Sequence, residues 1–227
     1  MSGALLAAEA VTKAFGATPA LRGATMSMQA GEIVAVMGPS GSGKSTLLHA
    51  LAGILTPDTG AVWYDGRRLD TLSDPERTRL RRTEFGFVFQ FGQLVPELTA
   101  EDNVALPLLL CGTRRGEAYR RARAWFSRLG IDGLQSRRTG ELSGGQAQRV
   151  AIGRALVGEP KVLFADEPTG SLDSLTGEHV MDLLTATAQA AGTAVLLVTH
   201  DPRIAAHADR EIVVRDGNIA TTQRALP

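Results

Sequence analysis

A glycine-rich turn between an apolar run and a helix-compatible stretch constrains this chain more than any other feature. The turn follows residues 33–37, precedes residues 47–52 and reads Gly38-Pro39-Ser40-Gly41-Ser42-Gly43-Lys44-Ser45-Thr46. Its bracketing glycines and its Lys-Ser pair have the spacing of the loop that cradles phosphates between a strand and a helix. Glycines let backbone N–H groups curl toward an anion, and the helix N-terminus adds partial positive charge. The turn therefore predicts a site for a nucleoside triphosphate, with Lys44 reaching the β- and γ-phosphates and Ser45 holding Mg²⁺.

A pair of carboxylates stands at the end of another apolar run. Residues 162–165 are apolar, and Asp166 and Glu167 follow them directly. Open α/β sheets bind ligands at the carboxyl ends of their strands, where this pair is expected to lie. Asp166 suits Mg²⁺, held directly or through water, and Glu167 suits polarising an attacking water. Two acidic residues after a strand are often only solvated, but beside the phosphate-binding turn they predict an ATP-hydrolysing site.

A second candidate anion site lies far along the chain from the first. Ser143 precedes Gly144 and Gly145 at the start of a helix-compatible stretch that runs to residue 157. A serine cap and bare glycine backbone at a helix N-terminus favour an anion, although the same residues can simply cap a helix. One nucleotide needs only one phosphate loop. The second site therefore suggests that two copies pair head to tail, each completing the other's nucleotide site.

Apolar strand-like runs alternate with helix-compatible stretches along the chain. The runs at 85–89, 162–165 and 194–198 are almost wholly apolar, as buried parallel strands are. This alternation predicts an α/β fold, with a mostly parallel sheet and helices on both faces. The stretch from residue 91 to residue 158 indicates a helical insertion, in which Pro107 is expected to kink or break its helix.

Composition and charge narrow the class of protein. The chain of 227 residues carries no net charge, which gives no overall attraction to nucleic acid. The charge is unevenly distributed along the chain, because residues 67–138 hold 14 arginines and 9 acidic residues. This region is either a solvated surface or a surface that faces an anionic membrane or a partner. Cys111, the single cysteine, excludes a disulfide framework and is expected to be a buried thiol in a reducing setting. Residues 1–11 lack the pattern of a signal peptide, and the longest apolar run is too short to span a bilayer.

The segment Leu142-Ser143-Gly144-Gly145-Gln146, with Gln148-Arg149 after it, resembles the signature of ABC-type ATPases. The other motifs fall in the order of that family, so the resemblance covers nearly the whole chain. It implies a P-loop NTPase (RecA-like) core with an N-terminal antiparallel β subdomain and an inserted α-helical subdomain. A single ABC ATPase domain is expected over 1–227, with 1–90 and 159–227 forming the nucleotide-binding core and 91–158 the helical subdomain.

The same resemblance implies roles for individual residues. Phe15 stands where the family places an aromatic side chain that stacks on adenine. Gln90 stands where a glutamine touches Mg²⁺ and the attacking water and begins the link to a membrane partner. His200 stands where a histidine contacts the γ-phosphate, and Ser171-Leu172-Asp173 resembles the loop that crosses the dimer interface. The implied catalytic residues are Glu167, His200, Lys44 and Gln90, and the implied Mg²⁺ ligands are Ser45, Gln90 and Asp166.

A narrower resemblance points to one group within the family. The segments 87–90, 94–99 and 165–173 are similar to those of the lipoprotein-releasing, macrolide-exporter and cell-division group of ABC ATPases. The similarity implies a homodimer on MgATP that drives an FtsX-like permease, exporting or extracting a hydrophobic or peptide-like substrate. It also implies an accessory protein in the periplasm or outside the cell, no nucleic-acid partner, and a cytoplasmic location on the inner face of the plasma membrane.

Three other functions stay open from the sequence. The same ATPase could signal through its permease to an envelope enzyme or to cell division without transport. It could also serve an importer, because some amino-acid importers share many of these motifs. A soluble ATPase acting on DNA or ribosomes is disfavoured, because the chain has one signature, no heptads for a long coiled coil and no net charge.

Overall fold

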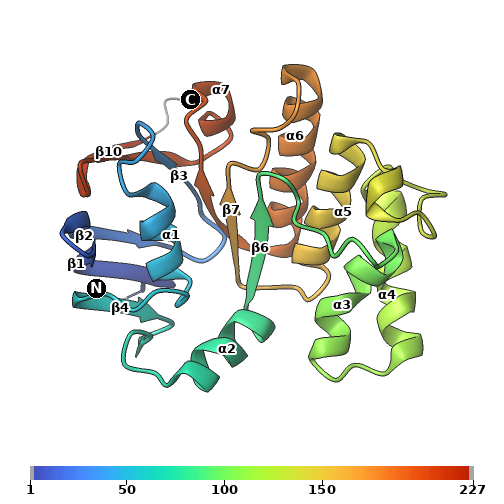
Figure 1. Ribbon diagram of the computed structural model, residues 1–227, viewed down its shortest axis with the longest axis horizontal. Coiled ribbons are helices and arrows are strands. Elements are labelled where there is room, and N and C mark those ends of the chain that lie inside the picture. The colour runs from blue at the N-terminus through green and yellow to red at the C-terminus, as the bar shows by residue number, and fades with distance from the viewer. Residues whose placement is uncertain (1–2, 225–227) are drawn as a thin grey trace.

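A six-stranded sheet with helices on both faces forms the centre of the computed structural model, which describes residues 3–224 (Figure 1). Met1 and Ser2 of the N-terminal stretch lie outside these residues. The strands, in the order β10-β9-β3-β8-β7-β6, are β3 (Ile33–Met37), β6 (Phe85–Phe89), β7 (Val162–Asp166), β8 (Ala194–Val198), β9 (Arg210–Arg215) and β10 (Asn218–Arg224). Neighbouring strands pair in parallel, except β9 and β10, which form an antiparallel hairpin. The predicted α/β class with a mostly parallel sheet is confirmed.

Alternate residues of each central strand feed two apolar cores on opposite faces of the sheet. The helices are α1 (Lys44–Leu51), α2 (Asp74–Thr83), α3 (Ala100–Leu110), α4 (Arg115–Arg128), η1 (Thr139–Glu141), α5 (Gly144–Leu156), α6 (Ser174–Ala191) and α7 (Pro202–Ala205). In β8, Val195 and Leu197 belong to the core shared with α5 and α6, whereas Leu196 and Val198 belong to the core shared with α1. A strand buried on both faces has no polar positions, which explains why these runs are apolar throughout.

A second sheet covers the other side of α1. Its strands, in the order β2-β1-β4-β5, are β1 (Leu6–Phe15), β2 (Thr18–Met28), β4 (Thr59–Tyr64) and β5 (Arg67–Arg68). All of their pairings are antiparallel. Helix α1 therefore lies between the two sheets, as Figure 1 shows. This position fixes the helix rigidly behind the glycine-rich turn that precedes it.

Every regular element of the described chain between β6 and β7 is a helix, namely α3, α4, η1 and α5. Thr99 caps α3, because its hydroxyl accepts a hydrogen bond from the backbone N–H of Asp102 at 3.1 Å. Ser143 caps α5 in the same way. No helix within residues 3–224 combines the length and the apolar character that a membrane span needs. The division into two subdomains at residues 91 and 158 stays a prediction.

The expectation that Pro107 breaks its helix is wrong, and so is the expectation that Cys111 is a buried thiol. A kink at Pro107 stays a prediction. Helix α3 continues through Pro107 to Leu110, because Val104 and Leu108 are buried against neighbouring helices and hold the turn that the proline weakens. Cys111 is exposed, because it follows the last turn of α3 and does not lie on the buried face of the helix. Its thiol donates to the backbone oxygen of Arg82 at 3.3 Å.

Candidate functional site

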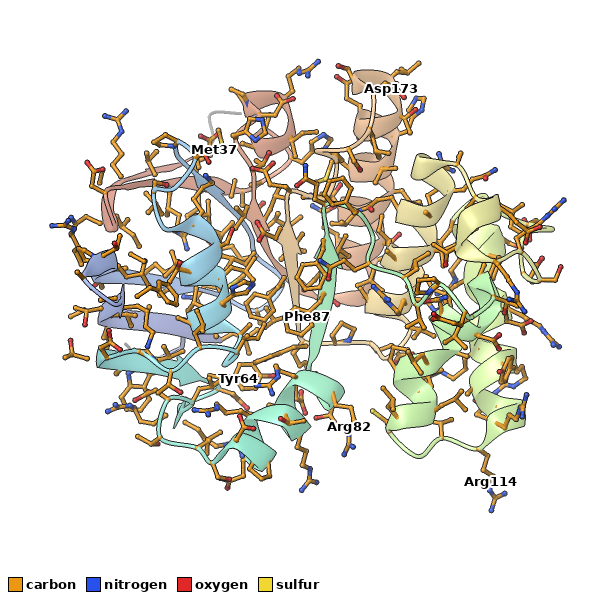
Figure 2. All side chains as sticks on the ribbon, viewed as in Figure 1. Met37, Tyr64, Arg82, Phe87, Arg114 and Asp173 are labelled. Atoms are coloured by element: carbon orange, nitrogen blue, oxygen red, sulfur yellow. The ribbon has the colours of Figure 1, made fainter. Side chains whose placement is uncertain are left out.

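The carboxyl ends of parallel strands bring the predicted site residues to one edge of the sheet. In Figure 2, Met37 at the end of β3 and Asp173 before α6 lie at the same end of the molecule, away from Tyr64 and Arg114. A pocket of about 670 Å³ opens at this edge. It is lined by Ala20, Pro39, Ser40, Gly41, Gly43, Lys44, Ser45, Thr46, Gln90, Asp166, Glu167, Val198 and His200.

The glycine-rich loop can take its shape only with glycine at two positions. Gly38 has a φ of 145°, and a Cβ atom there would lie 2.2 Å from the backbone oxygen of Val214. Gly43 has a φ of 106°, and a Cβ atom there would lie 2.4 Å from the backbone oxygen of Ala20. Both contacts are far inside van der Waals distance, so the loop depends on these glycines. Residues 39–41 and Gly43 of the loop line the pocket together with residues 44–46 at the start of α1.

Lys44 is held at the mouth of the loop. Its side chain is largely buried, and its ammonium donates to the backbone oxygens of Gly38 and Pro39, both at 2.9 Å. Backbone carbonyl oxygens carry no net charge, so they are weaker partners for an ammonium than anionic phosphate oxygens, with which both the donor and the acceptor are charged. The ammonium is therefore placed where an entering phosphate can take over its hydrogen bonds.

Three side chains offer oxygen ligands for a divalent cation. The Ser45 hydroxyl donates to Asp166 Oδ1 at 3.3 Å, and Gln90 lines the same pocket. Mg²⁺ is usually bound by one or two carboxylates together with substrate phosphates and water, and these residues fit that pattern. Within residues 3–224 no cluster of three or more His, Cys, Asp and Glu could hold a metal. The donor set therefore suits a cation that arrives with a nucleotide and does not form a separate protein cage.

Glu167 and His200 form a direct pair at the same edge. His200 Nδ1 lies 2.8 Å from Glu167 Oε1. Glu167 takes a left-handed backbone conformation, with a φ of 49°, and its backbone N–H donates to the oxygen of Val198 at 2.9 Å. A non-glycine residue in this region carries local strain, which is common at functional sites. The hydrogen bond between the two side chains fixes the Glu167 carboxylate at the wall of the pocket, a position from which a carboxylate can act as a general base.

Gln90 is fixed by two segments that lie far from it in the sequence. The hydroxyl of Ser171 donates to the backbone oxygen of Gln90 at 2.8 Å, and Gly170 lies so close that a Cβ atom there would be 2.9 Å from Gln90 Nε2. Gln148 of α5 donates to the neighbouring backbone oxygen of Phe89 at 3.0 Å. The sequence did not reveal this role of Gln148. The signal was a polar residue on the buried face of a helix, which needs an internal partner.

The second candidate anion site is not part of this pocket. None of residues 142–146 lines it, and Ser143 and Gly144 are exposed. The site nevertheless has the predicted form, because Ser143 accepts from the N–H of Gln146 at 3.3 Å and Gln146 accepts from the N–H of Ser143 at 2.9 Å. Such reciprocal bonds form a capping box.

The loop Ser171-Leu172-Asp173 lies beside this second site. A Cβ atom on Gly144 would lie 3.3 Å from Leu172 Cδ2. Asp173 caps α6 by accepting from the N–H of Thr176 at 3.0 Å, and this hydrogen bond lowers the pKa of the Asp173 carboxyl. The loop therefore spans the short distance between the Gln90 segment and the exposed start of α5.

Phe15 stands apart from the other predicted residues. It ends β1, its side chain is 52% exposed, and it is not among the residues that line the pocket. A large exposed aromatic side chain is uncommon in the described part of the chain, and Phe15 is one of a few. Its contact with adenine stays a prediction.

Comparisons with known proteins show what the sequence and the fold of this chain are similar to. The family model described as ABC transporter matches residues 21–170. The lipoprotein-releasing system ATP-binding protein LolD of Nitrobacter hamburgensis is 48% identical over 200 residues, which are 88% of this chain and 86% of that protein. The probable syringafactin export ATP-binding/permease protein SyfD of Pseudomonas syringae pv. syringae is 46% identical over 223 residues, which are 96% of this chain but only 34% of that longer protein. A dimeric structure of the ATP-binding cassette MJ0796, in a post-hydrolysis state with ADP and Pi, has a TM-score of 0.88 and 38% identity, covering 98% of this chain and 99% of that chain.

Proposed function

Because the chain belongs to the ABC transporter family of ATPases, we propose that it closes head to tail as a homodimer on two MgATP and so drives a membrane permease. The observation that carries this proposal is the position of Ser143. It forms an exposed helix N-terminus outside the pocket that contains Lys44 and Glu167. A second copy of the chain brings that N-terminus to the nucleotide without any change in the fold.

The residues around the pocket have different roles in the proposed phosphoryl transfer. Backbone N–H groups of the loop 38–46 and the Lys44 ammonium bind the phosphates, and Ser143 of the second copy adds donors at the γ-phosphate. Glu167 accepts the proton of the attacking water, and His200 keeps its carboxylate in place. Ser45, Gln90 and Asp166 would hold Mg²⁺, which would neutralise charge on the phosphate oxygens. Closure of the dimer excludes water and completes the site.

Replacing Glu167 by glutamine tests the proposal. The amide keeps the shape of the side chain but cannot accept the proton, so ATP turnover is expected to fall about 100-fold or more. MgATP binding is expected to remain, and dimers should accumulate in light scattering when MgATP is present. The double variant Glu167→Gln/Lys44→Ala serves as control, because it should stay monomeric. Turnover at the wild-type rate, or a monomer in MgATP, contradicts the proposal.

The partner and the substrate are proposed from the relatives. Export or extraction of a hydrophobic or peptide-like substrate is supported by relatives named for lipoprotein release and for syringafactin export, at 48% and 46% identity. An FtsX-like permease is proposed from the similarity of segments 87–90, 94–99 and 165–173 to the lipoprotein-releasing, macrolide-exporter and cell-division group. An accessory protein outside the membrane and a cytoplasmic position on the inner face of the plasma membrane follow from such a partner. Purification of the tagged chain from native membranes tests this: a permease encoded beside its gene should co-purify. Recovery of the chain only with nucleic acid contradicts it.

A further inference from the structure

Two segments at one end of the molecule carry exposed arginines. One segment is helix α2, and the other is the turn between α3 and α4 with the start of α4 (Figure 1). Figure 2 shows Arg82 and Arg114 at this end, whereas Met37 and Asp173 mark the other end, where the nucleotide pocket opens. The two segments meet, because the thiol of Cys111 donates to the backbone oxygen of Arg82 at 3.3 Å. They therefore form one continuous surface.

Four arginines give this surface its charge. Arg79 and Arg82 are exposed on α2, and Arg114 and Arg115 are exposed at the N-terminus of α4. We call these four residues the cationic end. None of them has a carboxylate within 4.0 Å among residues 3–224. Arg79 and Arg82 are three positions apart on a helix and repel each other, so the arrangement costs free energy until an anion approaches.

Other arginines of the same region have acidic partners. Six of them pair with carboxylates at 2.5–3.3 Å, namely Arg68, Arg77, Arg120, Arg121, Arg123 and Arg137. Their partners include Asp74 of α2 and Glu117 of α4. Glu76 of α2 accepts from the backbone N–H of Ser73 at 2.8 Å. The acidic residues of α2 and of the start of α4 are thus engaged, and the charge of the cationic end stays uncompensated within the described chain.

The four guanidinium groups of the cationic end do not converge on one hollow. Arg79 lines a hollow of about 530 Å³ beside β5, and Arg82 lines a different one beside β6. Arg114 and Arg115 line neither of these hollows. Arg115 lies over the ring of Tyr119, 5.3 Å from its centroid. A small anion needs polar groups that converge on it, so this arrangement suits an extended anionic surface that can meet all four groups together.

We propose that the cationic end lies against anionic lipid headgroups of the membrane that holds the permease. The proposal rests on the permease partner proposed above and adds a lipid contact to it. One arginine close to an anionic membrane surface strengthens adsorption about fivefold, so four arginines strengthen it about 500-fold. The attraction acts within about 8 Å at physiological salt, and added salt weakens it.

The place of the cationic end in the molecule fits a lipid contact. The nucleotide pocket opens at the other end, so a bilayer against the cationic end leaves the pocket accessible to MgATP (Figure 2). A chain that is attached both to its permease and to lipid is held by two contacts, and the second contact raises the effective concentration of the first. The lipid contact therefore keeps the chain beside its permease when the dimer opens.

Vesicle binding of the purified chain tests the proposal. The chain is mixed with vesicles made of equal parts of phosphatidylglycerol and phosphatidylcholine or, separately, with vesicles of phosphatidylcholine alone. Flotation then measures the bound fraction. The wild type is expected to bind the anionic vesicles about 100-fold or more tightly than the neutral ones. Raising the salt concentration to about 0.5 M is expected to remove most of that difference, because the charges are then screened.

Two double variants locate the contact. Arg79→Gln/Arg82→Gln and Arg114→Gln/Arg115→Gln are each expected to weaken binding to the anionic vesicles about 25-fold, because each removes two charges. None of these four residues lines the nucleotide pocket, so ATP turnover in solution should stay at the wild-type rate. Unchanged turnover also shows that the variants are folded.

Arg22→Gln/Arg215→Gln is the matched control. It removes the same charge from exposed positions on β2 and β9, outside the cationic end, and should bind the vesicles as the wild type does. Equal losses for this control and for the two test variants overturn the proposal, because they indicate an effect of net charge alone. Equal binding of the wild type to anionic and neutral vesicles overturns it too.

Two further measurements separate lipid from other partners. If the test variants lose the permease in detergent solution and keep their binding to anionic vesicles, the arginines contact protein and the proposal is wrong. A DNA duplex that competes the wild type away from the vesicles at an equal concentration of phosphate groups also overturns it. A wild type that binds anionic vesicles but captures no permease contradicts only the proposed function. A wild type that captures the permease but does not bind anionic vesicles contradicts only the lipid contact.

Discussion

Helices α1 and α5 begin with similar local chemistry but lie in opposite surroundings. Helix α1 follows the glycine-rich loop, and α5 follows Ser143 and begins with two glycines. The start of α1 opens into the pocket at the ends of β7 and β8, where Asp166, Glu167 and His200 stand around it. The start of α5 is exposed, and none of residues 142–146 lines that pocket.

The difference teaches that a helix N-terminus is only one part of a phosphate-handling site. Both N-termini favour an anion through their N–H groups and dipole. Only the start of α1 shares its pocket with Asp166, Glu167 and His200, the residues proposed to hold Mg²⁺ and to activate water. The capping box of Ser143 and Gln146 satisfies α5 without a ligand, so this helix is stable while its N-terminus stays exposed. We therefore expect α1 to bind nucleotide within its own chain and α5 to act on the nucleotide of another chain.

Removing the Lys44 ammonium at the start of α1 is expected to have the largest effect on ATP binding and turnover. Lys44→Ala deletes the ammonium that lies at the mouth of the loop, so ATP turnover should fall about 100-fold or more and nucleotide affinity should fall with it. Calorimetric titration with MgATP and release of phosphate measure the two losses. Lys161→Ala is the control, because Lys161 is exposed and is not part of the pocket. If Lys44→Ala bound MgATP as tightly as the wild type does, the start of α1 would not be the nucleotide-binding helix N-terminus, and the contrast drawn between α1 and α5 would be wrong.

Changing the start of α5 should abolish turnover while leaving its own nucleotide pocket intact. Ser143→Asp keeps a good N-cap, so the free energy of unfolding is expected to change by only about 0.5 kcal/mol. The added carboxylate repels a γ-phosphate brought to this helix, and turnover is expected to fall about 100-fold. MgATP affinity of the monomer should match that of the wild type. A loss of affinity equal to the loss of turnover would mean that α5 acts within its own chain.

Mixing the two inactive variants tests the exchange between chains directly. A heterodimer of Lys44→Ala with Ser143→Asp contains one site in which both the loop and the signature are unaltered. Phosphate release is therefore expected to reappear on mixing, at up to about half the wild-type rate for the fraction of dimers that are mixed. Each variant alone is the control. No activity at any mixing ratio, with dimers present in light scattering, would contradict head-to-tail sharing.

The comparison also marks what the sequence can predict. The loop at 38–46, the carboxylates at the end of β7 and the cap of α5 depend on residues close together in the chain, so their spacing predicts where they lie. Their roles in binding and catalysis stay predictions. The hydrogen bonds from Gln148 to Phe89, from Ser171 to Gln90 and from Arg154 to Gly92 join residues 59, 81 and 62 positions apart. Such contacts depend on how helices and strands pack, and no local pattern encodes them. The same limit explains α3, where packing of buried residues overrides the tendency of Pro107 to end a helix.

Phe15 offers the smallest and most specific test of the α1 side. If its exposed ring stacks on adenine, Phe15→Ala should weaken ATP binding about tenfold, because stacking of a base on an aromatic side chain contributes about 1–3 kcal/mol. The maximal turnover rate should stay near that of the wild type, since the ring touches no reacting atom. Phe91→Ala is the matched control: its ring is 73% exposed and also does not line the pocket, but it follows Gln90 and does not end β1. Inorganic triphosphate has no base to stack on the ring, so it should bind equally well to the wild type and to Phe15→Ala. If Phe15→Ala weakened the binding of ATP and of triphosphate equally, Phe15 would act by stabilising β1 and not by contacting adenine. The loop before α1 would then be the one contact with the nucleotide, among those tested, that its own chain provides.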